Sequence, residues 1–358
     1  MLNRKKAKVI QITSDRPGAT DLLVELNGRS ECATNYPGLT GAVSPGDEVL
    51  LNTTAVDLAL GTGGVHFVMC NLSNPDQPVE SSDGHIMKLR YTPLQVALHC
   101  IEEDDIKDRI QEFKSLDGMP VVCCELHSQI APVAAAIKAA NSQTRTTYIM
   151  TDGATLPIGF SRLVAELKEK RLIDITITCG QAFGGDLEAI NVYSAIIAAK
   201  EVARADVVIV CQGPGNAGAA TKYGFSGIQQ GDALNAVSML GGAPIMVLRM
   251  SFEDARERHR GMSHHSRTIL ERIALRPVVI AMPELEDGKA FFVQEQMELL
   301  LQETEHQVRR VDAEIGIQEL ERQGIQVTTM GRTVEQDREF FLAGSAAGVV
   351  AGQLLSGK

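Results

Sequence analysis

The pattern of apolar positions changes near residue 93. Before this point, short runs rich in Val, Ile and Leu are separated by Gly, Pro and Asn, which favour tight turns. Several short strands at this spacing predict a small barrel or sandwich, and the polar segment 74–84 is the expected linker that follows it. We therefore expect a β-rich domain over residues 1–92, with strands in KVIQIT (8–13), DLLVEL (21–26), EVLLNTT (48–54) and VHFVMCNL (65–72).

From residue 93 to 358, apolar runs of strand length alternate with helix-length stretches, clearest at 161–171, 189–204 and 266–275. The runs lack polar alternation, which is typical of strands that are covered on both faces. Alternating strands and helices predict a doubly wound, mostly parallel α/β sheet. The expected strands are MPVVCCE (119–125), TTYIMT (146–151), DITITC (174–179), DVVIVCQ (206–212), PIMVLRM (244–250), PVVIAM (277–282) and QVTTMG (326–331).

A charged stretch over 284–323 has apolar positions near the i, i+3, i+4 spacing, so we expect a largely helical, solvated pair there. Its apolar face would pack on the sheet or on a second copy of the chain, which leaves a homo-oligomer open.

Composition narrows the class of protein. The formal net charge of −11 argues against general nucleic-acid binding, which needs a basic face. The apolar run at the N-terminus is too short for a signal peptide, and no run approaches the roughly 18 residues of a membrane span. The segment 343–355 comes nearest, and its small residues indicate a closely packed terminal helix. Seven cysteines without a C-x-x-C pair suit a reducing compartment, so we expect a cytoplasmic protein that binds neither nucleic acid nor membrane.

Polar residues follow several of the expected strands, where open α/β sheets bind ligands. His127, Asp152 and Asp186 are the candidates for proton transfer at such an edge. Each also has a structural interpretation: His127 can be a satisfied buried histidine, and Asp186 can cap a helix that begins near Leu187. Cys179 ends an apolar strand, and an inert buried thiol is the preferred interpretation.

The segment QGPGNAG (212–218) carries a G-x-G-x-x-G pattern after an expected strand, at Gly213, Gly215 and Gly218, with Asn216 between them. Backbone N–H groups of such a loop can hold a phosphate, helped by a following helix N-terminus. A tight glycine loop needed for close packing explains the pattern equally well. Pro214 lacks a donor and Asp232 does not end a strand, so a dinucleotide site is disfavoured, and no particular cofactor is indicated.

The stretch RHRGMSHHSRT (258–268) holds three histidines and three arginines. Ser263 is the expected N-cap of a helix that starts at His264, whose dipole favours neutral imidazoles. Adjacent histidines on a helix point about 100° apart, which argues against one shared ion. His259, His264 and His265 with Asp152 or Asp254 nevertheless remain a metal alternative. We favour an anion site formed by Arg260, Ser263, His264 and His265, with Arg256 and Arg258 paired to acidic neighbours on the surface.

Four stretches carry a resemblance: GDEVLLNTTAVDLALGTGG (46–64), GHIMKLRYTPLQ (84–95), CQGPGNAG (211–218) and RHRGMSHHSRT (258–268). In these the chain resembles an uncharacterised bacterial family known only as a domain of unknown function, over nearly its whole length. The resemblance implies a bacterial cytosolic protein. It implies no catalytic role for any residue.

Three functions are compatible with these patterns. The first is an enzyme, or a ligand-processing protein, that acts on a small phosphorylated or carboxylated molecule. His127, Asp152 and Asp186 would then handle protons, while the glycine loop and the histidine stretch hold the anion. The second is a non-catalytic regulatory protein that senses such a ligand. The third is a metal-dependent hydrolase.

Overall fold

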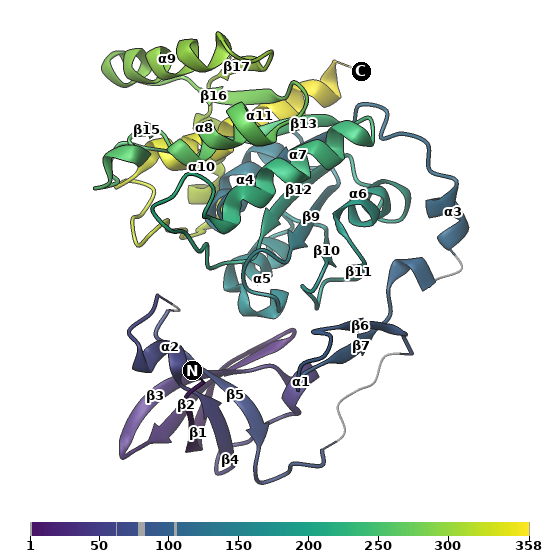
Figure 1. Ribbon diagram of the computed structural model, residues 1–358, viewed down its shortest axis with the longest axis vertical. Coiled ribbons are helices and arrows are strands. Elements are labelled where there is room, and N and C mark those ends of the chain that lie inside the picture. Colours follow the sequence, from purple (N-terminus) through teal and green to yellow (C-terminus); the bar gives the residue numbers. More distant parts are fainter. Residues whose placement is uncertain (1, 62, 78–82, 104–105, 358) are drawn as a thin grey trace. The chain divides into compact units, whose positions relative to one another are not determined.

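The computed structural model describes residues 2–61, 63–77, 83–103 and 106–357 (Figure 1). Residues 78–82 of the expected linker lie outside the described residues. The chain folds into two compact units. The N-terminal unit comprises Met1–His99 with Pro157–Ala165, and the C-terminal unit comprises Cys100–Leu156 with Glu166–Lys358.

The N-terminal unit is built around a closed barrel with strand order β1-β2-β3-β5-β4. Neighbouring strands are antiparallel except β3 and β5, which are parallel. Apolar residues alternate into the interior along the strands, as Leu22, Val24 and Leu26 do in β2. The elements are β1 (Arg4–Arg16), β2 (Ala19–Leu26), β3 (Arg29–Asn35), α1 (Pro37–Thr40), β4 (Glu48–Asn52), α2 (Thr54–Asp57) and β5 (His66–Asn71), followed by the hairpin β6 (Ile86–Lys88) and β7 (Val96–Leu98).

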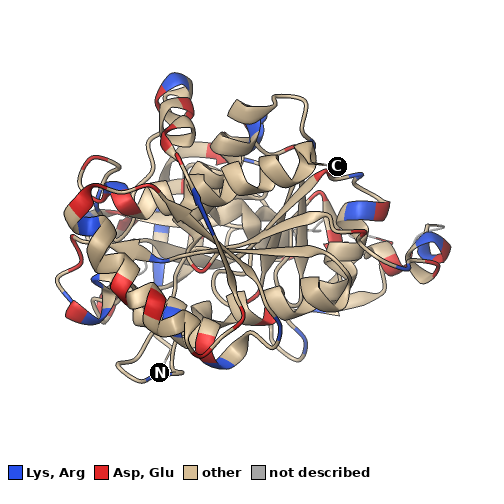
Figure 2. Ribbon diagram, turned by 90° about the horizontal axis from the view of Figure 1, so that it is seen from above, with Lys and Arg blue, Asp and Glu red and all other residues tan. Residues whose placement is uncertain are grey.

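The C-terminal unit contains an eight-stranded sheet of order β11-β10-β9-β12-β8-β13-β16-β17, and every neighbouring pair is parallel. The central strands are fully buried because helices cover both faces (Figure 2). The strands are β8 (Pro120–Cys123), β9 (Thr146–Thr151), β10 (Ile175–Cys179), β11 (Leu187–Ala189), β12 (Val207–Gln212), β13 (Ala243–Val247), β16 (Val279–Pro283) and β17 (Gln307–Val311).

Five of the helices pack in two groups. One group, α4, α10 and α11, packs together, while α6 packs against α7 and both contact the sheet. Only α11, among the helices of the described residues, is long and apolar enough to cross a membrane by length and composition, and most of it is buried in this fold. The helices of this unit are α3 (Lys107–Gln111), α4 (Ile130–Ala140), α6 (Val192–Glu201), α7 (Gln229–Met239), α8 (His264–Thr268), α9 (Asp287–Leu301), α10 (Glu314–Gln323) and α11 (Arg338–Ser356). Helix α5 (Arg162–Glu169) begins in the N-terminal unit and ends in this one.

The predicted α/β architecture after a small β-rich domain is confirmed, and so is the helical pair over 284–323, which forms α9 and α10. Three details differ from the prediction. The edge strand β17 lies between these two helices, because polar residues are tolerated at a sheet edge. Residues 326–331 form no strand beyond one isolated bridge, Thr329 to Arg332. Helix α6 begins at Val192 and is capped by Asn191, so Asp186 does not cap it.

The order of the central strands produces a switch point between β8 and β12. These neighbours lead into helices of different groups, α4 after β8 and α7 after β12. Connections that diverge at the carboxyl ends of adjacent strands leave a place for ligands in doubly wound sheets. The polar residues described next lie at this edge.

Candidate functional site

The histidine stretch is a folded loop that closes on itself. Two-residue strands β14 (Met250–Ser251) and β15 (Gly261–Met262) pair antiparallel at its ends. Gly261 has φ +65°, and a Cβ there would lie 2.6 Å from Oε1 of Gln296, so only glycine fits this turn. The predicted N-cap is confirmed, since the Ser263 hydroxyl accepts a hydrogen bond from the backbone N–H of His265 at the start of α8.

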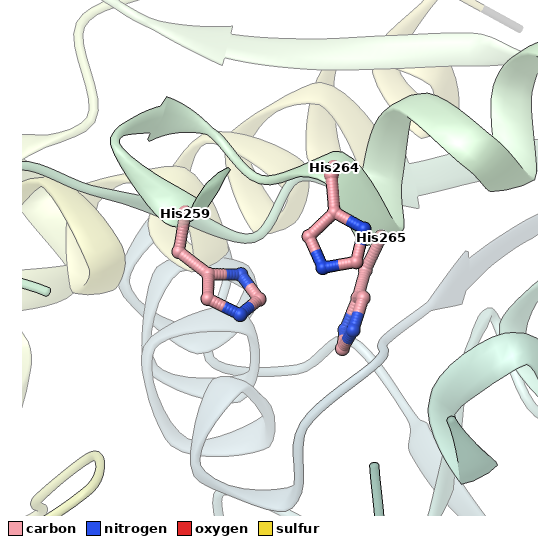
Figure 3. Close-up of side chains that lie close together, drawn as sticks. All are labelled: His259, His264 and His265. Carbon is pink, nitrogen blue, oxygen red and sulfur yellow. The ribbon is translucent and has the colours of Figure 1, made fainter. Parts of the chain in front are cut away.

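This loop brings three imidazole rings together (Figure 3). His259, His264 and His265 each offer one ring nitrogen, and these nitrogens all lie within 4.8 Å of one another. The expected divergence of His264 and His265 does not keep them apart, because both stand at the first turn of α8 and His259 approaches from the loop. Three convergent imidazoles are the ligand set of several catalytic zinc sites.

The environment keeps two of these rings neutral. Burial, the charge of Arg249 and that of Arg256 lower the pKa of His259 to about 3. Burial, followed by the neighbouring His265 ring and the charge of Arg258, lowers the pKa of His264 to about 4. Nε2 of His264 is buried and has no hydrogen-bond partner among the described residues. Neutral imidazoles with an available lone pair are the form that binds metal.

Glu125, which follows β8, fixes the third ring. Its side chain is 0 % exposed, and its Oε1 lies 2.6 Å from Nδ1 of His265. Nη1 of Arg249 also lies 3.1 Å from Nδ1, but the carboxylate is the closer neighbour and favours the tautomer in which Nδ1 donates to Glu125, which leaves the lone pair on Nε2. A histidine whose Nδ1–H donates to a carboxylate is the usual arrangement behind a metal-ligating Nε2.

Arg249, which follows β13, completes this buried group. Its Nη1 donates to Oε1 of Glu125 at 3.1 Å, and its other terminal nitrogen lies 3.8 Å from the Asp254 carboxylate. Burial alone would raise the pKa of Glu125, but the hydrogen bond from His265 and the charge of Arg249 lower it overall. Glu125 is therefore a buried anion balanced by a buried guanidinium.

Phe225, which follows the glycine loop in the chain, contacts two of the histidines through its ring. Phe225 stacks on His265, with ring centroids 3.8 Å apart and planes 4° apart, and lies edge-on to His264. The backbone of Phe225 forms an isolated antiparallel bridge with Gly218. Asn216 secures the same connection, because its Oδ1 accepts from Ser226 Oγ and Gly227 N. The loop thus covers one side of the imidazole group with an apolar ring.

The rest of the loop shows close packing. A Cβ on Gly213 would lie 2.3 Å from the Thr155 carbonyl oxygen, and Pro214 O accepts from both N and Oγ1 of Thr155. Gly215 has φ +102° and is exposed. Helix α7 begins only at Gln229, so no helix N-terminus follows the pattern directly. These contacts explain the glycines at 213 and 215 without a bound phosphate.

Two of the predicted acid–base residues lie near this edge. His127 directs Nδ1 to the Gln212 carbonyl oxygen at 3.2 Å and to Tyr148 Oη at 3.3 Å, and burial lowers its pKa to about 4. Asp152 accepts a hydrogen bond from the backbone N–H of Gln181. Both residues follow strands that neighbour β12, at the edge where open α/β sheets bind ligands.

Asp186 lies elsewhere. It accepts hydrogen bonds from N and Oγ1 of Thr176, near the amino end of β10, and pairs with Lys168. Burial would raise its pKa, but Lys168 and Thr176 lower it overall. The structure therefore ties Asp186 into a local ion pair at the opposite end of the strand from the histidines.

The surroundings of Arg256, Arg258 and Arg260 differ from one another. Arg260 is exposed, with its guanidinium 5.5 Å from the centroid of the Phe292 ring on α9. Arg256 forms a bidentate pair with Asp254, as expected. Arg258 is exposed, and its charge acts on His264. Arg258, rather than Arg260, is thus the arginine of this stretch with an electrostatic link to His264.

Sequence reasoning gave no site role to Glu125, Arg249 or Phe225, although Glu125 was noted among the polar residues that follow the expected strands. A signal existed for the first two, because each is a charged residue directly after a buried apolar run. Such a residue is costly to bury without a partner and therefore indicates one. Phe225 gave no signal, since its role depends on how the loop from 213 to 226 folds back.

No curated protein and no solved structure matches the chain. A family model described as a protein of unknown function, DUF3866, matches residues 32–348, which include the barrel strands from β3 onward, the glycine loop and all three histidines. The chain therefore belongs to the DUF3866 family of proteins of unknown function.

Proposed function

We propose that this protein is a metal-dependent enzyme that activates water at His259, His264 and His265. The observation that carries the proposal is the convergence of three imidazole nitrogens within 4.8 Å, backed by the buried Glu125 carboxylate on His265. Ligands supplied only by nitrogen suit Zn²⁺ and related transition ions, whereas Mg²⁺ and Ca²⁺ prefer oxygen.

The donor set fits a zinc-type ion. Nδ1 of His265 donates to Glu125. In the His259 tautomer that donates from Nδ1 to the Ser263 hydroxyl, 2.7 Å away, Nε2 of both rings is left for the ion. Nε2 of His264 is the buried atom without a partner among the described residues. An ion held by three protein ligands keeps a fourth position for water and lowers the pKa of that water to about 7.

The chain's own residues would support such a centre in three ways. Glu125 holds His265 in one tautomer and orientation, and Arg249 balances the carboxylate charge. Phe225 covers the face of His265 and excludes water from that side. His127 and Asp152, at the same edge of the sheet, remain the candidates for moving protons.

The substrate class that we propose is a small anionic molecule. Arg258 supports this class, because it is exposed, directly precedes His259 in the chain, and carries a charge that helps to lower the pKa of His264. A guanidinium beside a metal site suits a carboxylate or phosphate group on the substrate. Arg249 is already paired with Glu125 and Asp254, so it is not offered for this role.

Zinc titration of chelator-treated protein tests the proposal. We expect the wild type to bind one equivalent, and His264→Ala to bind at least about tenfold more weakly because one ligand is lost. His264 is only partly buried, so the variant is expected to fold, which circular dichroism checks. The exposed His85→Ala in the N-terminal unit is the matched control. Equal affinity in all three proteins contradicts the metal site, and metal binding without hydrolysis of carboxylated or phosphorylated esters and amides contradicts the enzyme.

A further inference from the structure

A cavity that none of the three histidines lines lies between α9 and the carboxyl ends of β16 and β17, at one edge of the eight-stranded sheet (Figure 1). Its volume is about 270 Å³, which is room for a molecule of roughly nine water-sized groups, such as leucine. The carboxyl ends of the strands are where open parallel sheets bind their ligands. The cavity is therefore large enough, and correctly placed, for a small organic molecule.

Helix α9 separates this cavity from the histidine stretch. Phe292 faces that stretch with its ring 5.5 Å from the Arg260 guanidinium, and Gln296 forms hydrogen bonds with the backbone of the same stretch. Ala290 and Val293 line the cavity instead. Because successive helix residues are turned by about 100°, these two pairs lie on different sides of α9. The cavity and the proposed metal centre are thus distinct places.

Arg310 on β17 directs its side chain to the α9 face of the sheet. It is the Cα partner of Met282 on β16, and both residues line the cavity. Residues alternate between the two faces along a strand, while partners on neighbouring strands share a face. Val308, two residues before Arg310, packs on the apolar cluster that includes Val293 of α9. The alternation therefore places the Arg310 guanidinium on the side of the sheet where the cavity lies.

Glu284 brings a carboxylate to the same cavity. It follows Met282 by two residues, and its backbone N–H continues the strand pairing by donating to Val311 O at 2.9 Å. The same alternation places the Glu284 side chain on the α9 face, as a diagonal neighbour of Arg310. Opposite charges on two neighbouring strands therefore flank one cavity.

These two charges are not paired within the part of the chain that the structure describes. No side-chain nitrogen of Arg310 lies within 4.0 Å of a carboxylate oxygen of Glu284 or of any other described residue. The Glu284 carboxylate likewise has no ion pair and no side-chain hydrogen bond there. Both residues are exposed, so a ligand can reach them from solvent. A charged pair that lines one cavity without meeting leaves both charges available to a ligand that carries both signs.

We infer that this cavity binds a free α-amino acid with an apolar side chain. The carboxylate of the ligand pairs with the Arg310 guanidinium, and its ammonium group pairs with the Glu284 carboxylate. The side chain of the ligand lies against Met282, Leu285 and Val293, which are the apolar part of the lining. A simple carboxylate would leave Glu284 without a counter-charge, and a simple amine would do the same to Arg310.

Calorimetric titration of the full-length, metal-free protein with L-leucine tests the site. We expect one equivalent to bind. Two leucine analogues, 4-methylpentanoate without the ammonium group and leucinamide without the carboxylate, are expected to bind at least about tenfold more weakly, because each loses one charged pair. Glycine, which lacks the apolar side chain, is expected to bind at least about tenfold more weakly as well. Absence of leucine binding, or equal affinity for leucine and 4-methylpentanoate, would overturn the inference.

Two variants assign the two ends of the ligand. Arg310→Gln is expected to weaken leucine binding at least about tenfold and to leave leucinamide binding unchanged, because leucinamide has no carboxylate for Arg310. Glu284→Gln is expected to weaken leucine binding by a similar factor and to leave 4-methylpentanoate binding unchanged. Both residues are exposed, so both variants are expected to fold, which circular dichroism checks.

Matched controls remove the same charges outside the cavity. Arg309→Gln changes the neighbouring residue of β17, which points to the opposite face of the sheet, and Glu303→Gln changes an exposed residue that does not line the cavity. Both controls are expected to keep the leucine affinity of the wild type. Wild-type leucine affinity in Arg310→Gln and Glu284→Gln would overturn the inference. These titrations use neither metal nor turnover, so their outcome is independent of the zinc titration.

Discussion

Glu125 connects residues that are far apart in the sequence. Its carboxylate receives hydrogen bonds from His265 and Arg249, and its surroundings leave it no contact with solvent. Removing the charge while keeping the shape therefore separates its effect on the metal from its effect on packing.

Glu125→Gln is expected to lower zinc affinity by about 10–100-fold, because His265 loses the carboxylate that raises its basicity. The amide oxygen can still accept from Nδ1–H, so the ring is expected to stay in place. Zinc titration in competition with a chelator measures the change, with the exposed Glu321→Gln on α10 as control. Unchanged affinity in Glu125→Gln would show that the carboxylate has no part in metal binding.

Gly227 is required for the position of Glu125. A Cβ at residue 227 would lie 2.5 Å from Cγ of Glu125, closer than packed carbon atoms allow. Gly227→Ala is expected to destabilise the protein by about 1–3 kcal/mol in urea unfolding, since the buried carboxylate must move. Gly288→Ala in α9 meets nothing within 4 Å and is expected to be neutral or slightly stabilising. Equal stability of the two variants would contradict the close approach.

Local chemistry at the residue scale could be predicted where it depends on neighbours in sequence. The stretch itself predicts Ser263 as an N-cap and a neutral His264. In the structure, burial is the main reason for the low pKa of His264, and neighbouring charges come second. The partnership of Glu125 with His265 spans 140 residues and depends on β8 and β13 being neighbours. No local pattern contains that information.

At the scale of elements, strands with dense apolar runs were predictable and the sheet edge was not. The edge strand β17 has the sequence QVRRV, whose polar residues resemble a solvated helix. Residues 326–331 were apolar for another reason, since Val327 and Thr329 are buried without joining the sheet. Apolar content thus reports burial, and only the pairing partners decide whether a strand forms.

The start of α6 offers a test of local assignment. Oδ1 of Asn191 accepts hydrogen bonds from the backbone N–H groups of Tyr193 at 2.9 Å and Ser194 at 3.1 Å. Asn191→Ala is expected to lower the free energy of unfolding by about 1 kcal/mol, because two N–H groups lose their acceptor. Asn191→Asp keeps an acceptor and should retain most of the stability. A loss in Asn191→Asp as large as in Asn191→Ala would argue against capping.

For the whole molecule, the order of a β-rich part and an α/β part was predictable from the change in periodicity. The return of residues 157–165 to the N-terminal unit was not, because it depends on long-range contacts. Arg16 donates to Gly159 O at 2.9 Å, and Asp21 pairs with both Arg16 and Arg162. The two links to the returning segment, from Arg16 to Gly159 and from Arg162 to Asp21, each span more than 130 residues of sequence.

The stability that Asp21 gives to this returning segment depends on pH. Burial would raise its pKa, but Arg16 and Arg162 lower it overall, so the folded state binds the proton more weakly than the unfolded chain. Its stabilising contribution is therefore complete above the ordinary pKa near 3.8 and is lost as the pH falls through the lower folded value. Asp21→Asn is expected to cost about 1–3 kcal/mol at pH 7 and clearly less at pH 3.

Urea unfolding at the two pH values measures this difference. Asp76→Asn, an exposed change in the same unit, is expected to have little effect at either pH. A cost for Asp21→Asn that stays constant from pH 7 to pH 3 would mean that Asp21 gains no stability from ionisation.

X-ray absorption at the zinc edge, on wild-type protein loaded with one equivalent, tests the three-histidine site most directly. We expect a first shell of nitrogen and oxygen only, with the outer-shell scattering of three imidazoles, which falls to two in His264→Ala. The chain also has seven cysteines, all free thiols. Sulfur in the first shell, or a spectrum that His264→Ala leaves unchanged, would contradict a metal centre at His259, His264 and His265.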